Sequence, residues 1–206
     1  MLAFAGLAQV SFADAYYTKN DFDASSGSLN LLDVASTFSS GTFAVSFELD
    51  KSLTDIFSVN NFFTFILGGP ESSFRVDIVC MGPQAMSMGV VGSAGTFPGG
   101  YTLSVPQTSG PFVLQVADGD ATLSYCENGE LNDIMTVVTD CVIPEVINMA
   151  TLTFAETTAS NITTWTGVVT ADDLANPTPA PSVPEPTTAT LSLLALAGLA
   201  ARRRRK

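Results

Sequence analysis

The chain has 206 residues, with 20 Asp and Glu against 8 Lys and Arg, a net charge of −12 and no histidine. The missing histidine excludes Ser-His-Asp and Cys-His catalytic arrangements and every His-ligated metal site. Five of the eight cations are the last five residues, so the remainder is more acidic still, which excludes nucleic acid and anionic lipid surfaces as its partners.

Residues 1–13 are apolar and rich in small side chains, and Ser11-Phe12-Ala13 fits the small-x-small pattern that precedes signal-peptidase cleavage. The basic residues that usually open a signal peptide are missing. We therefore expect an export signal whose true start lies upstream. A first buried strand is the alternative.

The next segments are expected to form one folded domain, because about 130–150 residues are enough for a single core. Residues 14–40 are an N-terminal strand region, and residues 41–175 are the main unit. Alternation is clearest in residues 41–50, where Phe43, Val45, Phe47 and Leu49 share one face. We expect that face to be core and the other face, with Ala44, Ser46 and Glu48, to be solvated.

The following segments also have the pattern of strands. Residues 55–67 predict two short strands broken at Asn60-Asn61, and further strands are predicted over 74–81, 86–91, 101–105, 111–117, 149–154 and 162–168. Asp118-Gly119 and Asn128-Gly129 favour hairpin turns with positive φ. Roughly ten short strands at this spacing predict an all-β fold, an antiparallel β-sandwich.

After the last predicted strand, Thr170 is expected to cap a short helical turn, with Asp172 and Asp173 near its positive end. Residues 165–174 (Trp-Thr-Gly-Val-Val-Thr-Ala-Asp-Asp-Leu) and 123–131 (Leu-Ser-Tyr-Cys-Glu-Asn-Gly-Glu-Leu) make this part resemble the concanavalin-like jelly roll of laminin-G-type domains. The resemblance covers about residues 41–175. Residues 135–147 depart from the family order, so no family binding loop is carried over.

Carboxylates are the only candidates for hydrolytic chemistry. Laminarinase-type glycosidases share this sandwich and use a Glu-x-Asp-x-Glu strand motif, which Glu48-Leu49-Asp50 matches in part. The third acid is absent, since Lys51 and Ser52 follow. We interpret Glu48 and Asp50 as a solvated strand edge and assign no catalytic residue.

The residues that could bind a ligand also have simpler structural explanations. Asp118, Asp120, Glu127 and Glu130 could gather oxygens for calcium, but turn chemistry explains them more simply, and no metal site or cofactor is predicted. Trp165 and Tyr125 could stack on a sugar, although a single Trp in a sandwich is more often core.

Three cysteines are an odd number for an exported protein. The predicted disulfide joins Cys126 and Cys141 across a hairpin-sized gap and leaves Cys80 buried and free. Three separate cysteines without histidine argue against structural zinc.

The C-terminal part reads as a spacer and a membrane segment. Residues 176–183 contain alternating prolines, which predict an extended linker. Residues 187–201 carry no charge and are followed by Arg202, Arg203, Arg204, Arg205 and Lys206. A helix of this length covers roughly 22 Å of a ~30 Å hydrocarbon core, so snorkelling of the cations would have to close the gap. The positive-inside rule places the cations in the cytoplasm; a buried core helix is the alternative.

Val183-Pro184-Glu185-Pro186, the apolar helix and the terminal Arg cluster together resemble the PEP-CTERM sorting tail of Gram-negative bacteria, here residues 184–206. Such tails are the proposed substrates of exosortase, a membrane protease and transpeptidase. The resemblance implies Sec export, recognition at Pro184-Glu185-Pro186, a temporary inner-membrane anchor, removal of the helix and delivery to the cell surface or extracellular matrix.

Two functions remain open. The leading hypothesis is a non-enzymatic exported surface or matrix protein whose jelly-roll module binds an extracellular polysaccharide. The alternative is a glycoside hydrolase on the same fold, which needs a carboxylate pair in an aromatic-lined cleft.

Overall fold

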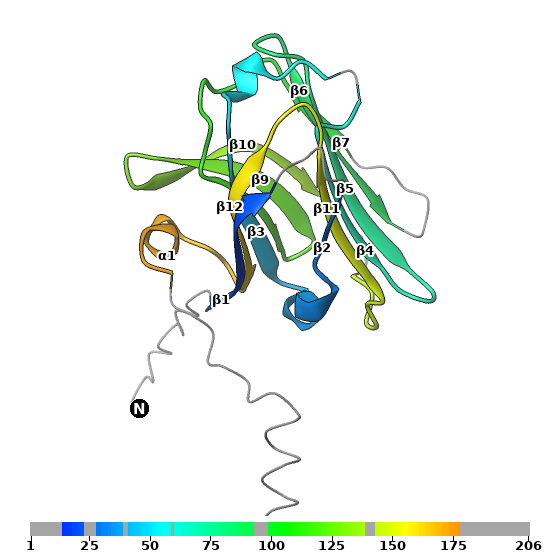
Figure 1. Cartoon of the computed structure of the whole chain (residues 1–206). Helices are drawn as coiled ribbons and strands as arrows, with labels where there is room; N and C mark the ends of the chain where they lie inside the picture. The colour runs from blue at the N-terminus through cyan, green and yellow to red at the C-terminus, as the bar shows by residue number, and fades with distance from the viewer. Residues whose placement is uncertain are drawn as a thin grey trace, which may run out of the picture.

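The computed structural model describes residues 14–22, 28–38, 41–58, 60–92, 99–138 and 143–177. These residues form two antiparallel six-stranded sheets that pack face to face as a β-sandwich (Figure 1). The predicted all-β class and the two-sheet sandwich are confirmed, and the arrangement is consistent with a jelly-roll-like fold.

Sheet A contains, in spatial order, β1 (Asp14–Phe22), β12 (Ala159–Thr166), β3 (Phe43–Leu49), β8 (Phe112–Ala117), β9 (Asp120–Glu127) and β10 (Glu130–Val138). Sheet B contains β2 (Ser28–Asn30), β11 (Met149–Phe154), β4 (Phe63–Gly68), β5 (Ser73–Cys80), β6 (Met86–Gly92) and β7 (Gly99–Thr102). Two 3₁₀ turns, η2 (Leu32–Thr37) and η3 (Leu53–Asp55), and one short helix, α1 (Ala171–Ala175), complete the described elements.

The middle of the chain forms two meanders, β4 to β7 in sheet B and β8 to β10 in sheet A. The hairpins of the second meander turn where the sequence predicts. Asp118 and Gly119 have φ of 53° and 85°, and Asn128 and Gly129 have φ of 54° and 79°. Positive φ at both central residues gives a turn whose twist matches the flanking strands, so these dipeptides set the register of β9 against both neighbours.

Phenylalanine dominates the core between the sheets. Phe43 and Phe47 on β3 face Phe63 and Phe65 on β4, and all four are buried. The centroid of the Phe47 ring lies 5.2 Å from that of the Phe63 ring in a stacked arrangement. It lies 5.1 Å from the centroid of the Phe154 ring in an edge-on arrangement. Such ring pairs add to the roughly 1.5–3 kcal/mol that burial of each large apolar side chain contributes. The aromatic core therefore ties the centre of sheet A to the centre of sheet B.

Only the second half of the predicted strand pair over residues 55–67 is a strand, namely β4. The first half follows η3, which Ser52 caps by accepting a hydrogen bond from the Thr54 N–H at 3.4 Å. Phe57 then makes a single isolated bridge to Met81. The apolar spacing of this segment does not follow the two-residue period of a strand, and a capped turn competes successfully with the ladder.

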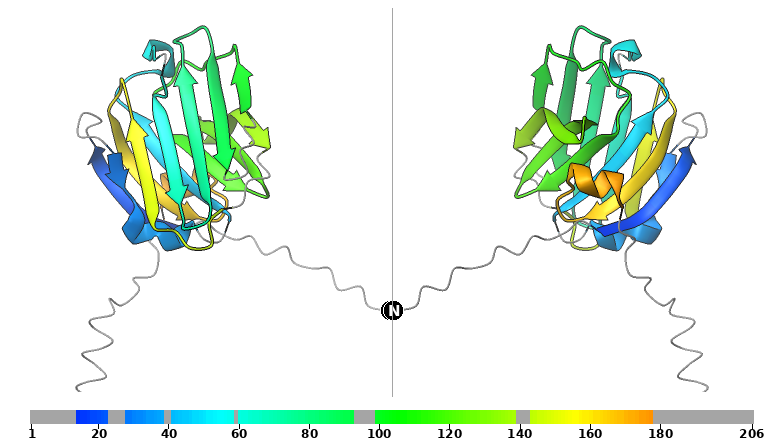
Figure 2. Two further views of the ribbon diagram at one scale, coloured as in Figure 1. Left: turned by 90° about the vertical axis from the view of Figure 1, so that its right-hand side faces the viewer. Right: turned by 90° about the vertical axis from the view of Figure 1, so that its left-hand side faces the viewer.

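The expectation that β3 has one solvated face is wrong. Ala44 is fully buried and Ser46 is 4% exposed, although both point away from sheet B. Figure 2 shows why: α1 lies on the outer side of sheet A, opposite to sheet B. The segment that follows β12 thus covers the outer face of sheet A.

Candidate functional site

Residues 167–177, which we name the C-terminal strap, cross the outer face of sheet A. Val169 and Leu174 of the strap pack with Ala44, Val113 and Trp165 into a second apolar cluster, separate from the main core. Because β12 leads directly into the strap, the described residues that follow β12 are held on the outer face of sheet A.

Three sets of polar contacts lie in and around the strap: the Val169 bond joins the strap to sheet A, the Trp165 bond lies within sheet A beneath the strap, and the Thr170 bonds lie within the strap itself. The Trp165 indole Nε1–H donates to Ser46 Oγ at 2.8 Å, and the Val169 N–H donates to Gln115 Oε1 at 2.9 Å. Thr170 caps α1 as predicted: its Oγ1 accepts from the Asp173 N–H, and its own N–H donates to Asp173 Oδ2, which completes a capping box.

From the sequence, Trp165 could be either a core residue or a residue that stacks on a sugar. It is 2% exposed, so its ring is part of the second cluster and offers no free stacking face. Tyr125 is half-buried and packs against the main core.

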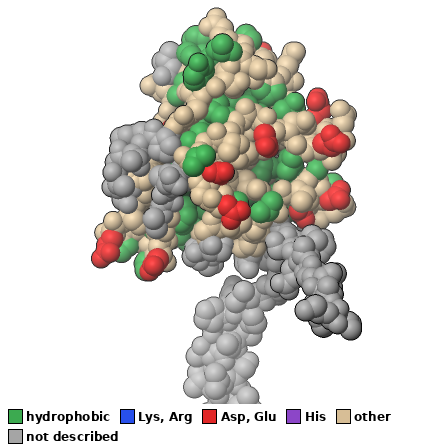
Figure 3. All heavy atoms as spheres, turned by 180° about the vertical axis from the view of Figure 1, so that it is seen from behind, with side chains coloured by type: hydrophobic (Ala, Val, Ile, Leu, Met, Phe, Trp, Pro, Cys, Tyr) green, Lys and Arg blue, Asp and Glu red, His purple; other side chains and the backbone are tan. Residues whose placement is uncertain are grey.

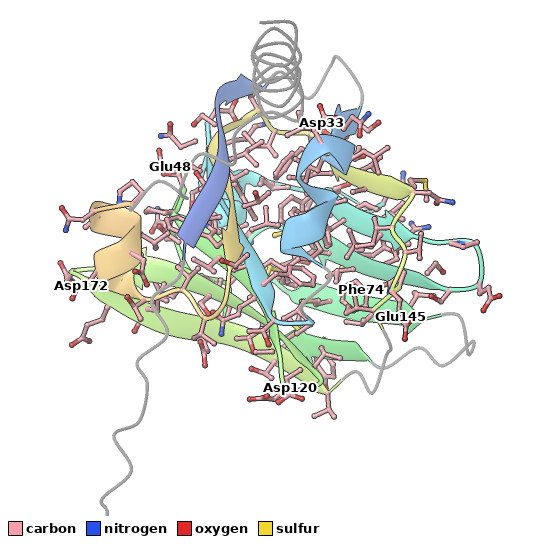
Figure 4. All side chains as sticks on the ribbon, turned by 90° about the horizontal axis from the view of Figure 1, so that it is seen from below. Asp33, Glu48, Phe74, Asp120, Glu145 and Asp172 are labelled. Atoms are coloured by element: carbon pink, nitrogen blue, oxygen red, sulfur yellow. The ribbon has the colours of Figure 1, made fainter. Side chains whose placement is uncertain are left out.

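A pocket of about 210 Å³ opens between the strap and the outer face of sheet A. Its walls come from β3, β12, the residue before β8 and the end of the strap; the lining residues are Ser46, Phe47, Glu48, Pro111, Asn161, Thr163, Trp165, Leu174 and Pro177. Figure 4 shows Glu48 on the side of the molecule where α1 lies, away from Asp120 and Glu145. The pocket combines one carboxylate with neutral polar groups and apolar walls.

A β-bulge shapes this pocket. The register of β12 against β3 shifts between Ser160 and Thr163, and Asn161 within the shift has φ of 50°. The extra residue bends the strand, so Asn161 and Thr163 both line the pocket. Sequence reasoning missed Asn161 and Thr163, since a bulge at a non-glycine residue leaves no local signal, and it missed Ser46 because it placed that residue on a solvated face.

Glu48 and Asp50 do not act as a pair in this pocket. Glu48 lines it, whereas Asp50 lies beyond the end of β3 and holds the loop before β12. Asp50 Oδ1 accepts hydrogen bonds from Thr157 Oγ1 at 2.7 Å and from the Thr158 N–H at 2.9 Å. Partial desolvation pushes the pKa of Asp50 upward, but these two bonds and the Lys51 charge outweigh it, so the net pKa is lowered.

We expect Asp50→Asn to lower the free energy of unfolding at neutral pH by about 1 kcal/mol, below the usual range for bonds to a charged group because solvent screens this side chain. A carboxylate with a lowered folded-state pKa stabilises fully above its unfolded pKa of about 3.9, and that stabilisation is lost as pH falls through the folded value. Urea unfolding from pH 7 to pH 3 should therefore show the two proteins converging in acid.

Thr157→Val is the matched control for this prediction, because it removes one donor and leaves the carboxylate. It should reproduce part of the loss and be non-additive with Asp50→Asn. A stability difference that stays constant down to pH 3 would contradict the assigned role of Asp50.

The four carboxylates considered for calcium do not converge. Asp118 and Asp120 lie at the first end of β9, and Glu127 and Glu130 lie at its other end, across an eight-residue strand. Among the described side chains, no three Asp, Glu, Cys or His residues gather closely enough to hold a metal ion. The hairpins explain these four residues, as their turn positions indicate.

The described cysteines are Cys80 and Cys126. Cys80 is fully buried, and its thiol donates to the Leu53 carbonyl oxygen at 3.2 Å. Desolvation by burial raises the pKa of this thiol, so it stays protonated and unreactive. Cys126 is half-buried on β9, and Cys141 lies outside the described residues, so their disulfide stays a prediction.

The sorting residues Val183, Pro184, Glu185 and Pro186, the apolar segment 187–201, the cations Arg202 to Lys206 and the signal segment 1–13 also lie outside the described residues. Within the part of the chain that the structure describes, no helix has the length and apolar character needed to cross a membrane.

Comparison with known families gives one match at the C-terminus. Residues 182–206 match the family model described as the PEP-CTERM protein-sorting motif, the motif that the sequence resembles there. Comparison with curated proteins gives no match. The motif implies an exported protein that an exosortase processes at the membrane and that is displayed at the surface. The chain thus carries a PEP-CTERM protein-sorting motif behind a β-sandwich body.

Proposed function

We propose that this protein is a non-enzymatic cell-surface or extracellular-matrix module that exosortase releases from a temporary inner-membrane anchor. The match of residues 182–206 to the sorting motif carries the proposal. The order of the parts supports it: the strap packs on sheet A, and a proline-rich segment separates it from Pro184-Glu185-Pro186.

The test is the intact mass of the protein from cells with and without the exosortase. We expect the C-terminal helix to be lost only when the enzyme is present. The double variant Pro184→Ala/Pro186→Ala should stay unprocessed, because it destroys the motif. The matched control Pro179→Ala/Pro181→Ala removes two prolines with the same spacing and should be processed normally. Retention of residues 187–206 in both hosts would refute the sorting proposal.

We further propose that the body is a concanavalin-like, laminin-G-type jelly roll that binds an extracellular polysaccharide. The two six-stranded sheets and the pocket on the outer face of sheet A support this reading. The arrangement of carboxylates favours binding over hydrolysis. A glycosidase needs two carboxyl groups, about 5–5.5 Å apart for retention or 6.5–9.5 Å apart for inversion. Among the described residues that line this pocket, Glu48 is the single carboxylate.

A glycan array followed by a reducing-end assay separates the two functions. Binding without release of new reducing ends would support a binding module. Release of reducing ends that Glu48→Gln abolishes would instead support the glycosidase.

A further inference from the structure

We propose that two copies of this chain associate through the outer face of sheet B, the face that points away from the core. This inference goes beyond the proposed function and does not rest on it. Figure 2 shows how the two sheets differ: α1 lies over the outer face of sheet A, whereas no described element lies over that of sheet B in the left view. The described part of sheet B therefore presents its strands openly.

The residues of this face alternate with core residues along each strand. In β5 the buried residues are Phe74, Val76, Ile78 and Cys80, so the residues between them point outward. The same alternation holds in β4, β6 and β11. The face is thus built from alternate residues of neighbouring strands, as in any sheet with one side packed on a core.

Charge restricts where two copies can meet. Once the five terminal cations are set aside, the chain keeps 20 Asp and Glu and is strongly negative, so its copies repel each other. Figure 3 shows Asp and Glu side chains on the face seen from behind, with no described Lys or Arg in view. By contrast, the six strands of sheet B contain two charged residues, Arg75 and Asp77, of opposite sign. Close approach at sheet B therefore brings no excess of negative charge together.

These two residues make the face complementary to itself. Arg75 Nε lies 2.7 Å from Asp77 Oδ2, and 43% and 19% of the two side chains are exposed. The ion pair uses Nε, so the Nη groups of the guanidinium can face another carboxylate. In a two-fold interface, if residue i of one copy contacts residue j of the other, j also contacts i. Rotation about an axis that crosses β5 between Arg75 and Asp77 places each residue against its opposite charge.

The same rotation matches large side chains with small ones. The outward residues of β4, β5 and β6 form two adjacent cross-strand rows, which are Ile66, Arg75 and Val91, then Thr64, Asp77 and Gly89. Exchange of the rows brings Val91 of one copy over Gly89 of the other, and Ile66 over Thr64. A Cβ added at Gly89 would meet no atom within 4 Å, so there is room for the valine. The strands of the two copies then run nearly parallel to one axis, as in aligned sheet packing.

The size of the face suits a weak, reversible dimer. The strands β11, β4, β5, β6 and β7 lie side by side. With strands about 4.8 Å apart and residues about 3.3 Å apart, they cover roughly 24 by 20 Å. Two such faces bury about 1,000 Å², the lower end for a specific interface. Tyr101 on β7 is 76% exposed and Met149 on β11 is 43% exposed, so apolar side chains are available at both sides of the face.

Sedimentation equilibrium of the full-length protein in density-matched detergent tests the inference, over protein concentrations that bracket micromolar dissociation constants. We expect a reversible equilibrium between monomer and dimer. Gly89→Glu puts one carboxylate from each copy into the middle of the interface and should raise the dissociation constant at least about tenfold. The matched control Ala175→Glu adds the same charge at the end of α1, on the side of sheet A, and should leave the dissociation constant unchanged.

A charge exchange tests the two-fold pairing. Arg75→Glu gives a face with two negative charges, and Asp77→Arg gives a face with two positive charges. Each variant alone should remain monomeric over the same concentrations, because like charges would meet. An equimolar mixture should associate at least about tenfold more tightly than either variant alone, because each face then meets its opposite. Thermal melting of each variant verifies that the sandwich is intact, and association of the mixture shows it independently.

A wild-type protein that stays monomeric over the whole concentration range would overturn the inference. So would a dimer that Gly89→Glu leaves unchanged, since association through the tail or another surface would survive that substitution. Failure of the two charge variants to associate when mixed would also overturn it. A monomer that binds a neutral glycan, and loses that binding in Gly89→Glu, would assign the outer face of sheet B to a sugar instead of a second copy.

Discussion

Phe47→Ala is expected to lower the free energy of unfolding by about 3–5 kcal/mol, and the midpoint of thermal unfolding by roughly 6–20 °C. The side chain is 2% exposed and meets three rings, those of Phe63, Phe112 and Phe154. The change removes a whole ring from between the two sheets, and the neighbouring rings cannot close the cavity without moving both β4 and β11. Urea unfolding of the purified protein measures the loss.

Phe57→Ala is the matched control for this prediction. It makes the same chemical change at a phenylalanine that is 61% exposed, so the stability should change by no more than about 0.5 kcal/mol. A loss of similar size in both variants would mean that the Phe47 ring does not join the sheets as described.

Trp165→Ala should lower the free energy of unfolding by about 3 kcal/mol. This is the lower end of the range for large-to-small changes, because the strap can move into part of the cavity that the indole leaves. The substitution should also free the strap. The second apolar cluster loses its largest side chain, and Val169 and Leu174 lose a surface to pack against. Limited proteolysis should then cut within residues 167–177 faster than in the parent protein, in addition to the loss measured by urea unfolding.

Trp165→Phe separates the hydrogen bond from the packing. It keeps an aromatic ring but loses the Nε1–H that donates to Ser46 Oγ. A double-mutant cycle with Ser46→Ala should give a coupling of about 0.5–1.5 kcal/mol. Additive effects would show that this hydrogen bond does not contribute to stability. An unchanged rate of strap cleavage in Trp165→Ala would show that the indole does not hold the strap.

The sequence carries those parts of the fold that depend on local rules. The two hairpins around β9 follow from Asp118-Gly119 and Asn128-Gly129, because these dipeptides tolerate positive φ. The start of α1 follows from Thr170, whose side chain can bond back to the first turn. The class of the fold follows from the two-residue period of strands such as β3.

Features set by distant contacts are not readable in the same way. The outer face of β3 looks solvated from residues 41–50 alone, because the strap that buries Ala44 and Ser46 is more than 120 positions away. The sorting tail is recognisable since its chemistry is contiguous. The pocket cannot be recognised from the sequence, because its residues come from four separate segments and their positions depend on a register shift at Asn161.

The pairing of β1 with β12 has a consequence for the timing of export. Asp14 lies opposite Thr166, so the first described strand finds its ladder partner only after almost the whole body has been synthesised. Contacts of such long sequence separation form slowly, because a large loop must close first. A chain that crosses a membrane with its N-terminus leading therefore presents β1 with both edges unpaired until β12 emerges. Because the sorting motif follows soon after β12, the sandwich closes at about the time its own tail reaches the membrane.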